Sequence, residues 1–515
     1  MTGLNSVAAH RAETRELAKS LRKAQVYHWL IVEGYFPENY VLPPCFSVIK
    51  RPSRPKVFYK IIKKKKITEY KPDISECIKV HFPKSELTDR VFGIIDPYIH
   101  NDIAYHISRN WKKIVDKLIP SDSLVTSYSF PVPINASTPG RLGFLRSGRL
   151  IYEFIVMTDD GLASIAYKYT HLVKADIKNF YPSIYTHSIA WAIHQKVTIR
   201  KKENRRNFKL LGNRIDKLFQ NANDGCTNGL PIGPVVSDIV AEIIVSAVDK
   251  VFSRYIRKEG IECEAVRFKD DYRILVSSES DAKRIVKYLQ YALQEYNLEL
   301  SDEKTKISLL PSGLFRDWVS KYHAVHPDKR NRYTWKQFRE LYLAVIEIDK
   351  VCPGTGVIDR FLADMVSRKG YLKVKLIARN LEKVVSMLLM LGDLRIKAFP
   401  KIIAIIESVL RSPVGVGHQK DIVEYLELFL KKLSLEEERN KYLISWICYF
   451  LVSNNLEKQL SFKPKFKDPI TRSIFMNRGN IFKDRKEFKL FMGSKTVAKK
   501  ISMLQHLEVF NPPRQ

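Results

Sequence analysis

The stretch AVRFKDDYRILV (Ala265 to Val276) decides the fold, because two adjacent carboxylates, Asp270 and Asp271, interrupt a run of β-type residues. Strands disfavour Asp, and adjacent acids repel each other. Residues 263–277 therefore predict a hairpin that turns at this pair, and the pair itself indicates a local rule broken for function. For an isolated Asp-Asp pair an ordinary turn is the simpler interpretation, and Asp159-Asp160 is such a neighbouring pair.

Two earlier segments complete the pattern. VKADIKNFYPSI (Val173 to Ile184) is an apolar strand that ends at Asp176, and GLPIGPVVSDIVA (Gly229 to Ala241) is a Gly/Pro-rich loop that leads into a helix. Phosphoryl transfer requires charge stabilisation and in-line alignment, and two hard cations roughly 3.5–4 Å apart supply both. Magnesium prefers oxygen ligands, so carboxylates from adjacent strands suit it. The three segments together predict a nucleotidyl-transfer site.

In this order the segments resemble the palm of the reverse-transcriptase family. That family carries Asp-x-x-x-(Phe/Tyr), then Gly-x-Pro-x-Gly-x-x-x-Ser, then an aromatic-x-Asp-Asp, which residues 176–180, 229–237 and 268–271 match. A fourth segment, LELSDEKTKI (Leu298 to Ile307), resembles the family segment whose Lys lies near the leaving pyrophosphate. The resemblance implies an enzyme, an RNA-directed DNA polymerase that adds dNTPs.

The resemblance implies a role for each matched acid and base. Asp176 and Asp270 would ligate two Mg²⁺ ions, with Mn²⁺ as the alternative metal, while the Ile177 carbonyl assists and Asp271 supports. Lys304 would be the general acid for pyrophosphate. These catalytic and metal-binding positions are expectations carried over from the family's motifs.

The resemblance also implies a nucleotide pocket. Tyr181, next to Phe180, would lie under the sugar and exclude a 2′-hydroxyl, and the backbone from Gly229 through Pro231 to Gly233 would approach the template–nucleotide pair. Contacts with triphosphate or template are also expected, more loosely, from Arg141, Arg146 and Arg149. A role as simple surface charge is an equal alternative for these arginines.

Three positions depart from the family pattern. Phe268 stands where a Tyr is usual, and Lys269 occupies a variable position that is normally small and lies near a primer terminus. Ile232 stands where many retroviral members have Gln. These changes leave the metal ligands intact and put ordinary primer-template copying in doubt.

The segments NFYPSIYTHSIAWAIH (Asn179 to His194) and GYFPENYVLPPCF (Gly34 to Phe46) resemble bacterial abortive-infection and defence-associated reverse transcriptases. That resemblance implies anti-phage defence, a helical-repeat domain in place of a thumb, and a homo-oligomer. It leaves open whether a partner noncoding RNA is copied or DNA product is made without template on a protein primer. Two alternatives remain: a mobile-element reverse transcriptase of the group II intron kind, and a non-catalytic RNA-binding scaffold with a relic palm.

Composition agrees with a nucleic-acid partner. Lys and Arg total 87 against 55 Asp and Glu, a formal charge of +32 with a pI of about 9.7. Such an excess favours polyanions, because each cation near a phosphate can release a condensed counterion. The six cysteines form no CxxC pair, which fits a reducing cytoplasm. The most apolar stretch, YLISWICYFLV (Tyr442 to Val452), is too short to span a bilayer, so no membrane is expected and a buried helix is predicted.

The pattern predicts an α+β fold of fingers and palm followed by an all-α domain. We expect an N-terminal helical extension at 1–50, the fingers and palm at 51–320, and an α-helical repeat domain with a basic tail at 321–515. Within the palm, an Asp-Gly turn at Thr158–Gly161 predicts a hairpin between strands at 149–157 and 169–177. Apolar spacing of three to four residues predicts helices at 335–350, 357–368, 374–391, 399–410, 420–433 and 441–452.

Overall fold

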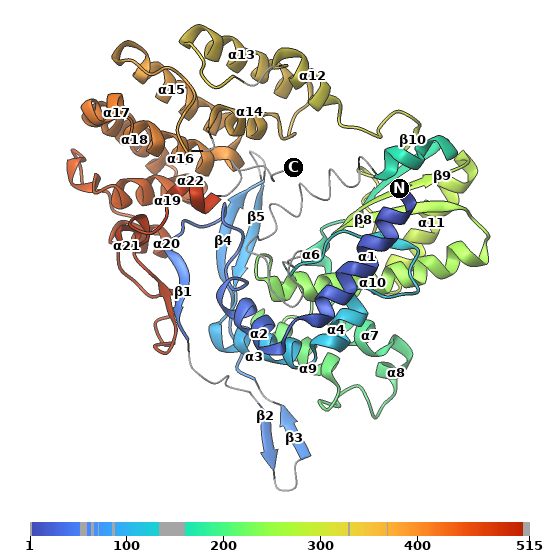
Figure 1. Cartoon of the computed structure of the whole chain (residues 1–515). Coiled ribbons are helices and arrows are strands. Elements are labelled where there is room, and N and C mark those ends of the chain that lie inside the picture. Colours follow the sequence, from blue (N-terminus) through green and yellow to red (C-terminus); the bar gives the residue numbers. More distant parts are fainter. Residues whose placement is uncertain are drawn as a thin grey trace. The chain divides into compact units, whose positions relative to one another are not determined.

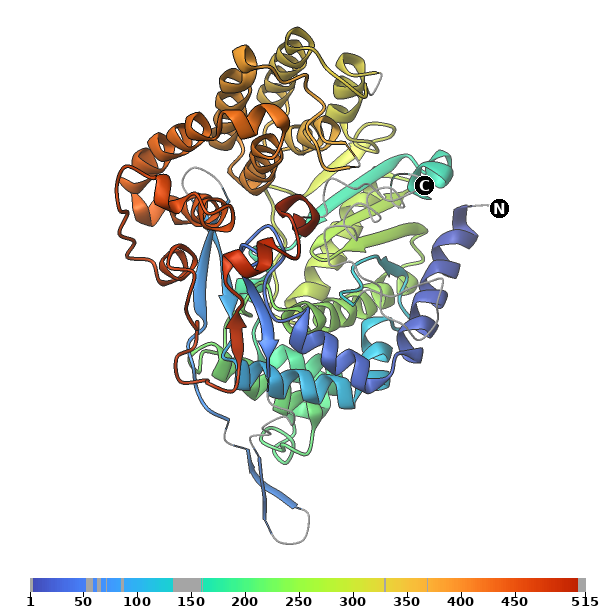
Figure 2. The ribbon, with the colours of Figure 1, turned by 60° about the vertical axis from the view of Figure 1, so that its left-hand side comes forward.

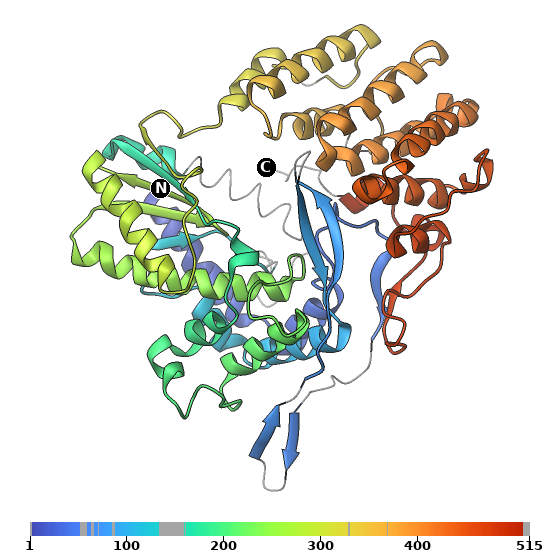
Figure 3. The same cartoon turned by 180° about the vertical axis from the view of Figure 1, so that it is seen from behind.

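The chain folds into two compact units that alternate along the sequence. Unit 1 comprises residues 1–37, 52–79 and 92–315, and unit 2 comprises residues 38–51, 80–91 and 316–515. Figures 1, 2 and 3 show this computed structural model from three sides. The structure describes residues 3–51, 59–62, 66–70, 72–84, 88–132, 159, 161–327, 330–367 and 369–507. The consecutive domain limits expected from the sequence stay a prediction.

A five-stranded sheet forms the centre of unit 1. Its strand order is β10-β7-β9-β8-β6, antiparallel except for the parallel pair of β6 with β8. The strands are β6 (Val125–Ser127), β7 (His171–Asp176), β8 (Cys263–Phe268), β9 (Asp271–Val276) and β10 (Lys306–Leu309). The hairpin expected at 263–277 is confirmed as β8 and β9, with its turn at Lys269 and Asp270.

Both faces of this sheet are covered, as the alternation along its strands requires. Val173 and Ile274 belong to the main core, whereas their neighbours Leu172 and Leu275 belong to a smaller cluster with Leu162. Helices α10 (Val235–Lys258) and α11 (Glu279–Gln294) lie along the main-core face (Figure 1). The sheet is therefore a rigid, buried platform whose strand ends can hold side chains in fixed positions.

The remaining helices of unit 1 complete the main core. Trp111 is fully buried there, and its indole N–H donates to the carbonyl of Ala18 at 2.7 Å. The helices are α1 (Gly3–Ser20), α2 (Lys23–Val32), α3 (Pro97–Arg109), α4 (Trp111–Leu118), α6 (Phe180–Ser183), α7 (His187–His194), α8 (Lys196–Arg200) and α9 (Leu211–Ala222). A separate hairpin is made by β2 (Tyr59–Ile62) and β3 (Lys66–Tyr70). Strands β4 (Ile78–Pro83) and β5 (Asp89–Ile94) also pair, and their residues are divided between the two units.

The hairpin turn predicted at Thr158–Gly161 is wrong. Residues 161–165 are helical, because Leu162 and Ile165, three positions apart, both bury their side chains in the smaller cluster. Asp159 instead forms a 3.2 Å ion pair with Arg273 of β9. The strand expected at 149–157 lies outside the described residues, and the strand expected at 169–177 is β7.

Unit 2 is mainly helical, and helices adjacent in sequence pack on one another (Figure 3). All six helices predicted between residues 335 and 452 have counterparts, although α14 ends and α15 begins a few residues away from the predicted limits. The helices are α12 (Asp317–Val325), α13 (Trp335–Val351), α14 (Val357–Met365), α15 (Ala378–Leu394), α16 (Phe399–Leu410), α17 (Pro413–Gly417), α18 (Gln419–Ser434), α19 (Glu437–Ser453), α20 (Pro469–Phe475), α21 (Ser494–Ala498) and α22 (Met503–Leu507).

Two features of unit 2 follow from its apolar residues. The stretch Tyr442–Val452 is buried throughout within α19, as predicted. Strand β1 (Phe46–Lys50) pairs antiparallel with β11 (Lys489–Phe491) (Figure 2). The rings of Phe46 and Phe491 meet edge to face with their centroids 5.3 Å apart. Within the part of the chain that the structure describes, no helix combines the length and apolarity needed to cross a bilayer.

Candidate nucleotidyl-transfer site

Three separated carboxylates meet at one end of the sheet in unit 1. Asp176 ends β7 and Asp271 begins β9, and the two are direct Cα partners across the antiparallel pair. The Ile177 N–H donates to the Asp270 carbonyl at 3.2 Å, which joins the end of β7 to the turn. Lys269 has a φ of +52°, a left-handed conformation that reverses the chain directly before the two acids.

Lys304 supplies the positive charge at this end of the sheet. Its ammonium donates to both carboxylate oxygens of Asp176, at 2.9 and 3.0 Å. The Ser301 N–H holds the Asp176 carbonyl at 2.8 Å, and β10 then pairs with β7, so the loop that carries Lys304 is anchored on both sides. The Lys304 side chain is 59% exposed and that of Asp176 is 12% exposed. An exposed ammonium therefore covers a largely buried acid.

Crowding of the acids changes their proton affinities. Desolvation and repulsion from Asp176 raise the pKa of Asp270. Desolvation, repulsion from Asp270 and a hydrogen bond with Asp176 raise the pKa of Asp271 to about 7, although Asp271 as a residue is exposed to solvent. For Lys304, partial desolvation acts against the charge, but the hydrogen bond to Asp176 and the neighbouring acids leave its pKa raised. The site has an excess of negative charge that one ammonium only partly neutralises.

These residues can hold a divalent cation. The described residues contain no ready-made group of three or more His, Cys, Asp or Glu side chains arranged to bind a metal. Magnesium does not require one, since it is commonly held by one or two carboxylates together with substrate phosphates and water. The Lys304 ammonium, bonded to Asp176, places a positive charge among these acids. The donor set therefore fits magnesium.

A pocket lies beside the turn. Phe180 and Tyr181, two of the predicted nucleotide-binding residues, line it together with Phe268 and Lys269. Phe180 is 4% exposed and belongs to the main core. Tyr181 is partly buried, and its hydroxyl donates to Asp238 at the start of α10. Tyr181 is thus the polar side chain of this aromatic pair, and it faces the pocket.

The Gly-rich loop is positioned by its backbone. Gly229 and Gly233 have φ values of +90° and +119°, which side chains rarely tolerate. A Cβ on Gly233 would lie 2.9 Å from Cγ of Pro37, and the Leu230 N–H donates to the Tyr181 carbonyl at 2.9 Å. Pro231 packs against Gly93. The loop is therefore fixed against Tyr181, and its predicted contact with a nucleotide stays a prediction.

The other predicted site residues fall into three groups. Asp176, Asp270, Asp271 and Lys304 are brought together, as described above. Residue 177 lies beside the turn, and the metal-ligand role of its carbonyl stays a prediction. Arg141, Arg146 and Arg149 lie outside the described residues.

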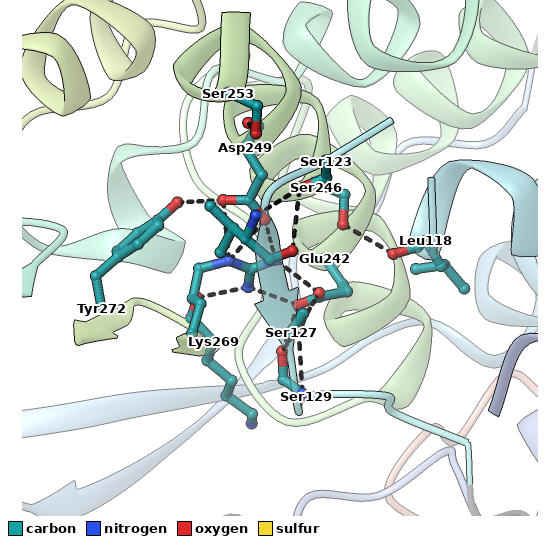
Figure 4. Close-up of polar contacts among 12 residues, drawn as sticks. Leu118, Ser123, Ser127, Ser129, Glu242, Ser246, Asp249, Ser253, Lys269 and Tyr272 are labelled. Carbon is teal, nitrogen blue, oxygen red and sulfur yellow. Dashed lines mark hydrogen bonds and ion pairs between the residues drawn. The ribbon is translucent and has the colours of Figure 1, made fainter. Parts of the chain in front are cut away.

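A buried ionic network below the turn was missed by the sequence analysis (Figure 4). Arg267 is 0% exposed, and its guanidinium bonds Glu242 and Asp249 of α10, each at 2.8 Å. The Ser127 and Ser129 hydroxyls each donate to Glu242 at 2.6 Å. The Tyr272 hydroxyl donates to Asp249 at 2.7 Å, and Arg267 also donates to the Lys269 carbonyl at 2.8 Å. Arg267 supplies one positive charge for two carboxylates, and the three hydroxyl donors stabilise the remaining negative charge. Through the Lys269 carbonyl the network also supports the turn from the interior of the unit.

The sequence did contain a signal for this network. Glu242 and Asp249 are spaced by seven residues among apolar residues of the helix, which places them on one face. Arg267 interrupts the apolar strand directly before the hairpin turn. A charged helix face and a charged strand position, both in buried elements, require each other as partners.

Comparison with known proteins agrees with this geometry. Residues 134–341 match the family model described as reverse transcriptase (RNA-dependent DNA polymerase), and the matched span contains the three acids, Lys304, Tyr181 and the Gly-rich loop. No curated protein matches the sequence.

Solved structures with a related chain course include telomerases. Apo telomerase from Candida tropicalis aligns at a TM-score of 0.34 and 11% identity, over 78% of this chain and 71% of that chain. Telomerase from Candida albicans in complex with a TWJ fragment of telomeric RNA aligns at 0.30 and 11%, over 78% and 66%. The family match carries more weight than these alignments: residues 134–341 form a reverse transcriptase domain, which indicates an RNA-directed DNA polymerase.

Proposed function

We propose that the chain adds dNTPs to a growing DNA strand at Asp176, Asp270 and Asp271, with two Mg²⁺ ions. The observation that carries the proposal is the direct pairing of Asp176 with Asp271 across β7 and β9, with the Lys304 ammonium on Asp176. When bound, the ions supply charge stabilisation and alignment of the attacking and leaving oxygens. Mn²⁺ is the alternative ion for the same oxygen donors.

The chain's own residues prepare the site for this chemistry. The backbones of Asp176 and Asp271 are fixed on paired strands, so the two acids are already side by side before substrate arrives. The raised pKa of Lys304 keeps its ammonium protonated, and the exposed side chain can exchange Asp176 for a pyrophosphate oxygen. Lys304 is therefore proposed as the proton donor to the leaving group. Tyr181 is proposed as the wall against which the nucleotide sugar lies.

We further propose a role in anti-phage defence of the abortive-infection kind, in the cytoplasm and as a homo-oligomer. The resemblance of Asn179 to His194 to defence-associated reverse transcriptases supports this role, as does the helical character of unit 2. A partner noncoding RNA is one template, and protein-primed synthesis without template is the other route. The charge of +32 supports contact with RNA or DNA product in either case.

The test is a primer-free incorporation assay with each dNTP and Mg²⁺, performed before and after RNase treatment of the purified protein. Product that survives RNase excludes an obligatory RNA template, and label that stays on denatured protein identifies protein priming. Asp270→Ala combined with Asp271→Ala should abolish incorporation and phage protection, whereas Asp73→Ala, which removes an exposed carboxylate of unit 1, should not. Incorporation that persists without both acids contradicts the proposal, and a wild-type chain that incorporates no dNTP would leave the non-catalytic scaffold as the explanation.

A further inference from the structure

Asp238 contacts two side chains that line the pocket, those of Tyr181 and Lys269. It lies in the first turn of α10, and its Oδ1 atom accepts a hydrogen bond from the Tyr181 hydroxyl. The Lys269 ammonium lies 3.8 Å from the same oxygen. The side chain of Asp238 is 16% exposed and that of Lys269 is 26% exposed, so water only partly screens this contact. One carboxylate therefore holds the aromatic wall and the hairpin turn together.

The direction of the Lys269 side chain is itself fixed. Arg267 donates to the Lys269 carbonyl, which holds the backbone of Lys269 at its positive φ, and the Lys269 ammonium reaches Asp238. Figure 4 shows the Lys269 side chain extending away from the buried network below the turn. Asp238 and Glu242 of the same helix both line the pocket, but Glu242 is occupied by Arg267 and the two serines. Asp238 is the carboxylate that faces the pocket's aromatic side chains.

We infer that Asp238 is a specificity-determining positioning residue, which fixes Tyr181 in the orientation that rejects ribonucleotides. This inference rests on the proposed contact of Tyr181 with the nucleotide sugar. A ring that can tilt makes room for one extra hydroxyl, and an apolar wall by itself discriminates weakly against an added hydroxyl. A hydrogen bond to a carboxylate is short and directional, so it removes that freedom. Lys269 keeps Asp238 in place and offsets its charge near an incoming triphosphate.

The same contact couples sugar selection to the catalytic turn. Lys269 precedes Asp270 directly, so a shift of the turn moves the ammonium relative to Asp238, and through Asp238 the Tyr181 hydroxyl. The wall against the sugar and the acids that hold the metal are then set by one connected group of side chains.

The experiment measures kcat/KM for dATP and for ATP with Mg²⁺ in the full chain. The variants are Asp238→Asn, Tyr181→Phe and the double variant, and Asp73→Asn is the control at an exposed carboxylate. Asp238→Asn weakens the charge-assisted bond and should lower the dATP/ATP ratio roughly tenfold. Tyr181→Phe keeps the ring and loses the hydroxyl, so it should lower the ratio by a similar factor, and the double variant should resemble either single variant. Asp73→Asn should leave the ratio as in the wild type.

Two results overturn the inference. One is an unchanged dATP/ATP ratio in Asp238→Asn, and the other is a double variant whose loss is the product of the single losses. If Asp238→Asn does not fold, the dATP/ATP ratio of Tyr181→Phe alone tests the inference, because this variant leaves Asp238 in place and breaks the same bond. An unchanged ratio in Tyr181→Phe then overturns it. Failure of the proposed function looks different: the wild-type chain then incorporates no dATP, or the variant without Asp270 and Asp271 still does.

Discussion

The Arg267 guanidinium donates a 2.8 Å hydrogen bond to the carbonyl of Lys269, the residue whose φ of +52° reverses the chain between β8 and β9. A fully buried cation thus fixes the backbone conformation of the residue directly before Asp270 and Asp271. The bond connects the interior of the reverse transcriptase domain to the acids that carry its proposed chemistry.

Replacing Arg267 by Met should destabilise unit 1 by about 3–5 kcal/mol, because Glu242 and Asp249 would remain buried without their cation. Urea unfolding of the full chain, combined with hydrogen exchange of the β8 and β9 amides, measures the loss. Arg284→Met removes solvent-screened ion pairs with Glu259 and Asp281, so its loss of stability should be far smaller. Equal losses for the two variants would show that the network does not stabilise the turn.

Replacing Lys304 by Met should lower kcat by roughly 10²–10⁴, the usual contribution of a positioned proton donor. Single-turnover incorporation of one dNTP gives the rate of the chemical step. Lys306→Met is the matched control, since Lys306 is an exposed lysine two residues further along the same segment. A rate for Lys304→Met within a few-fold of the Lys306→Met rate would remove Lys304 from the mechanism.

Replacing Gly233 by Ala should cost about 2–6 kcal/mol, the sum of backbone strain at a φ of +119° and the close contact with Pro37. Gly225 separates the two effects, because its φ is +79° but an added Cβ meets nothing within 4 Å. Gly225→Ala should therefore show strain alone, about 1–3 kcal/mol. Thermal unfolding of both variants provides the comparison, and equal shifts would mean that packing against Pro37 contributes nothing.

Unit 2 should lose stability in mild acid because of His506. Burial lowers the pKa of His506 to about 4, and its Nε2–H donates to the Asn39 carbonyl at 3.0 Å. In the unfolded chain His506 has a pKa of about 6.5, so the unfolded chain binds the proton more readily than the folded one. The free energy of unfolding is therefore at its full value above about pH 6.5 and decreases as the pH falls toward 4. The total is about 3 kcal/mol at most.

Hydrogen exchange of α22 and α19 at pH 7 and at pH 5 measures this loss directly. His506→Gln should remove most of the pH dependence in these helices, whereas His323→Gln, at an exposed position, should retain it. A wild-type chain with equal protection at both pH values would contradict the assignment to His506.

The sequence identified the acids because their pattern is local. Asp176 ends an apolar run, and Asp270 and Asp271 interrupt another, so each stands out from its neighbours. Asp238 did not stand out, because an acid in the first turn of a helix is ordinary, and its meaning depends on Tyr181, 57 residues away.

Local patterns also misled at one point. The Asp-Gly step at 160–161 is typical of a hairpin, yet the residues after it are helical, because the burial of Leu162 and Ile165 outweighs the turn preference. The helices of unit 2 were predictable from spacing alone, since each buries one apolar face. The sequence could not predict that residues 38–51 belong to unit 2, because no local pattern indicates a strand partner more than 400 residues later.

The pairing of β1 with β11 has a consequence for synthesis on the ribosome. Phe46 leaves the ribosome early, but its partner strand ends at Phe491. Strand β1 therefore stays unpaired until β11 has been translated. During that interval the strand edge and its aromatic side chain are available to other nascent chains or to chaperones. A recombinant fragment limited to the C-terminal helices would carry the opposite defect, an unpaired β11, and should aggregate unless Glu38–Arg51 is supplied with it.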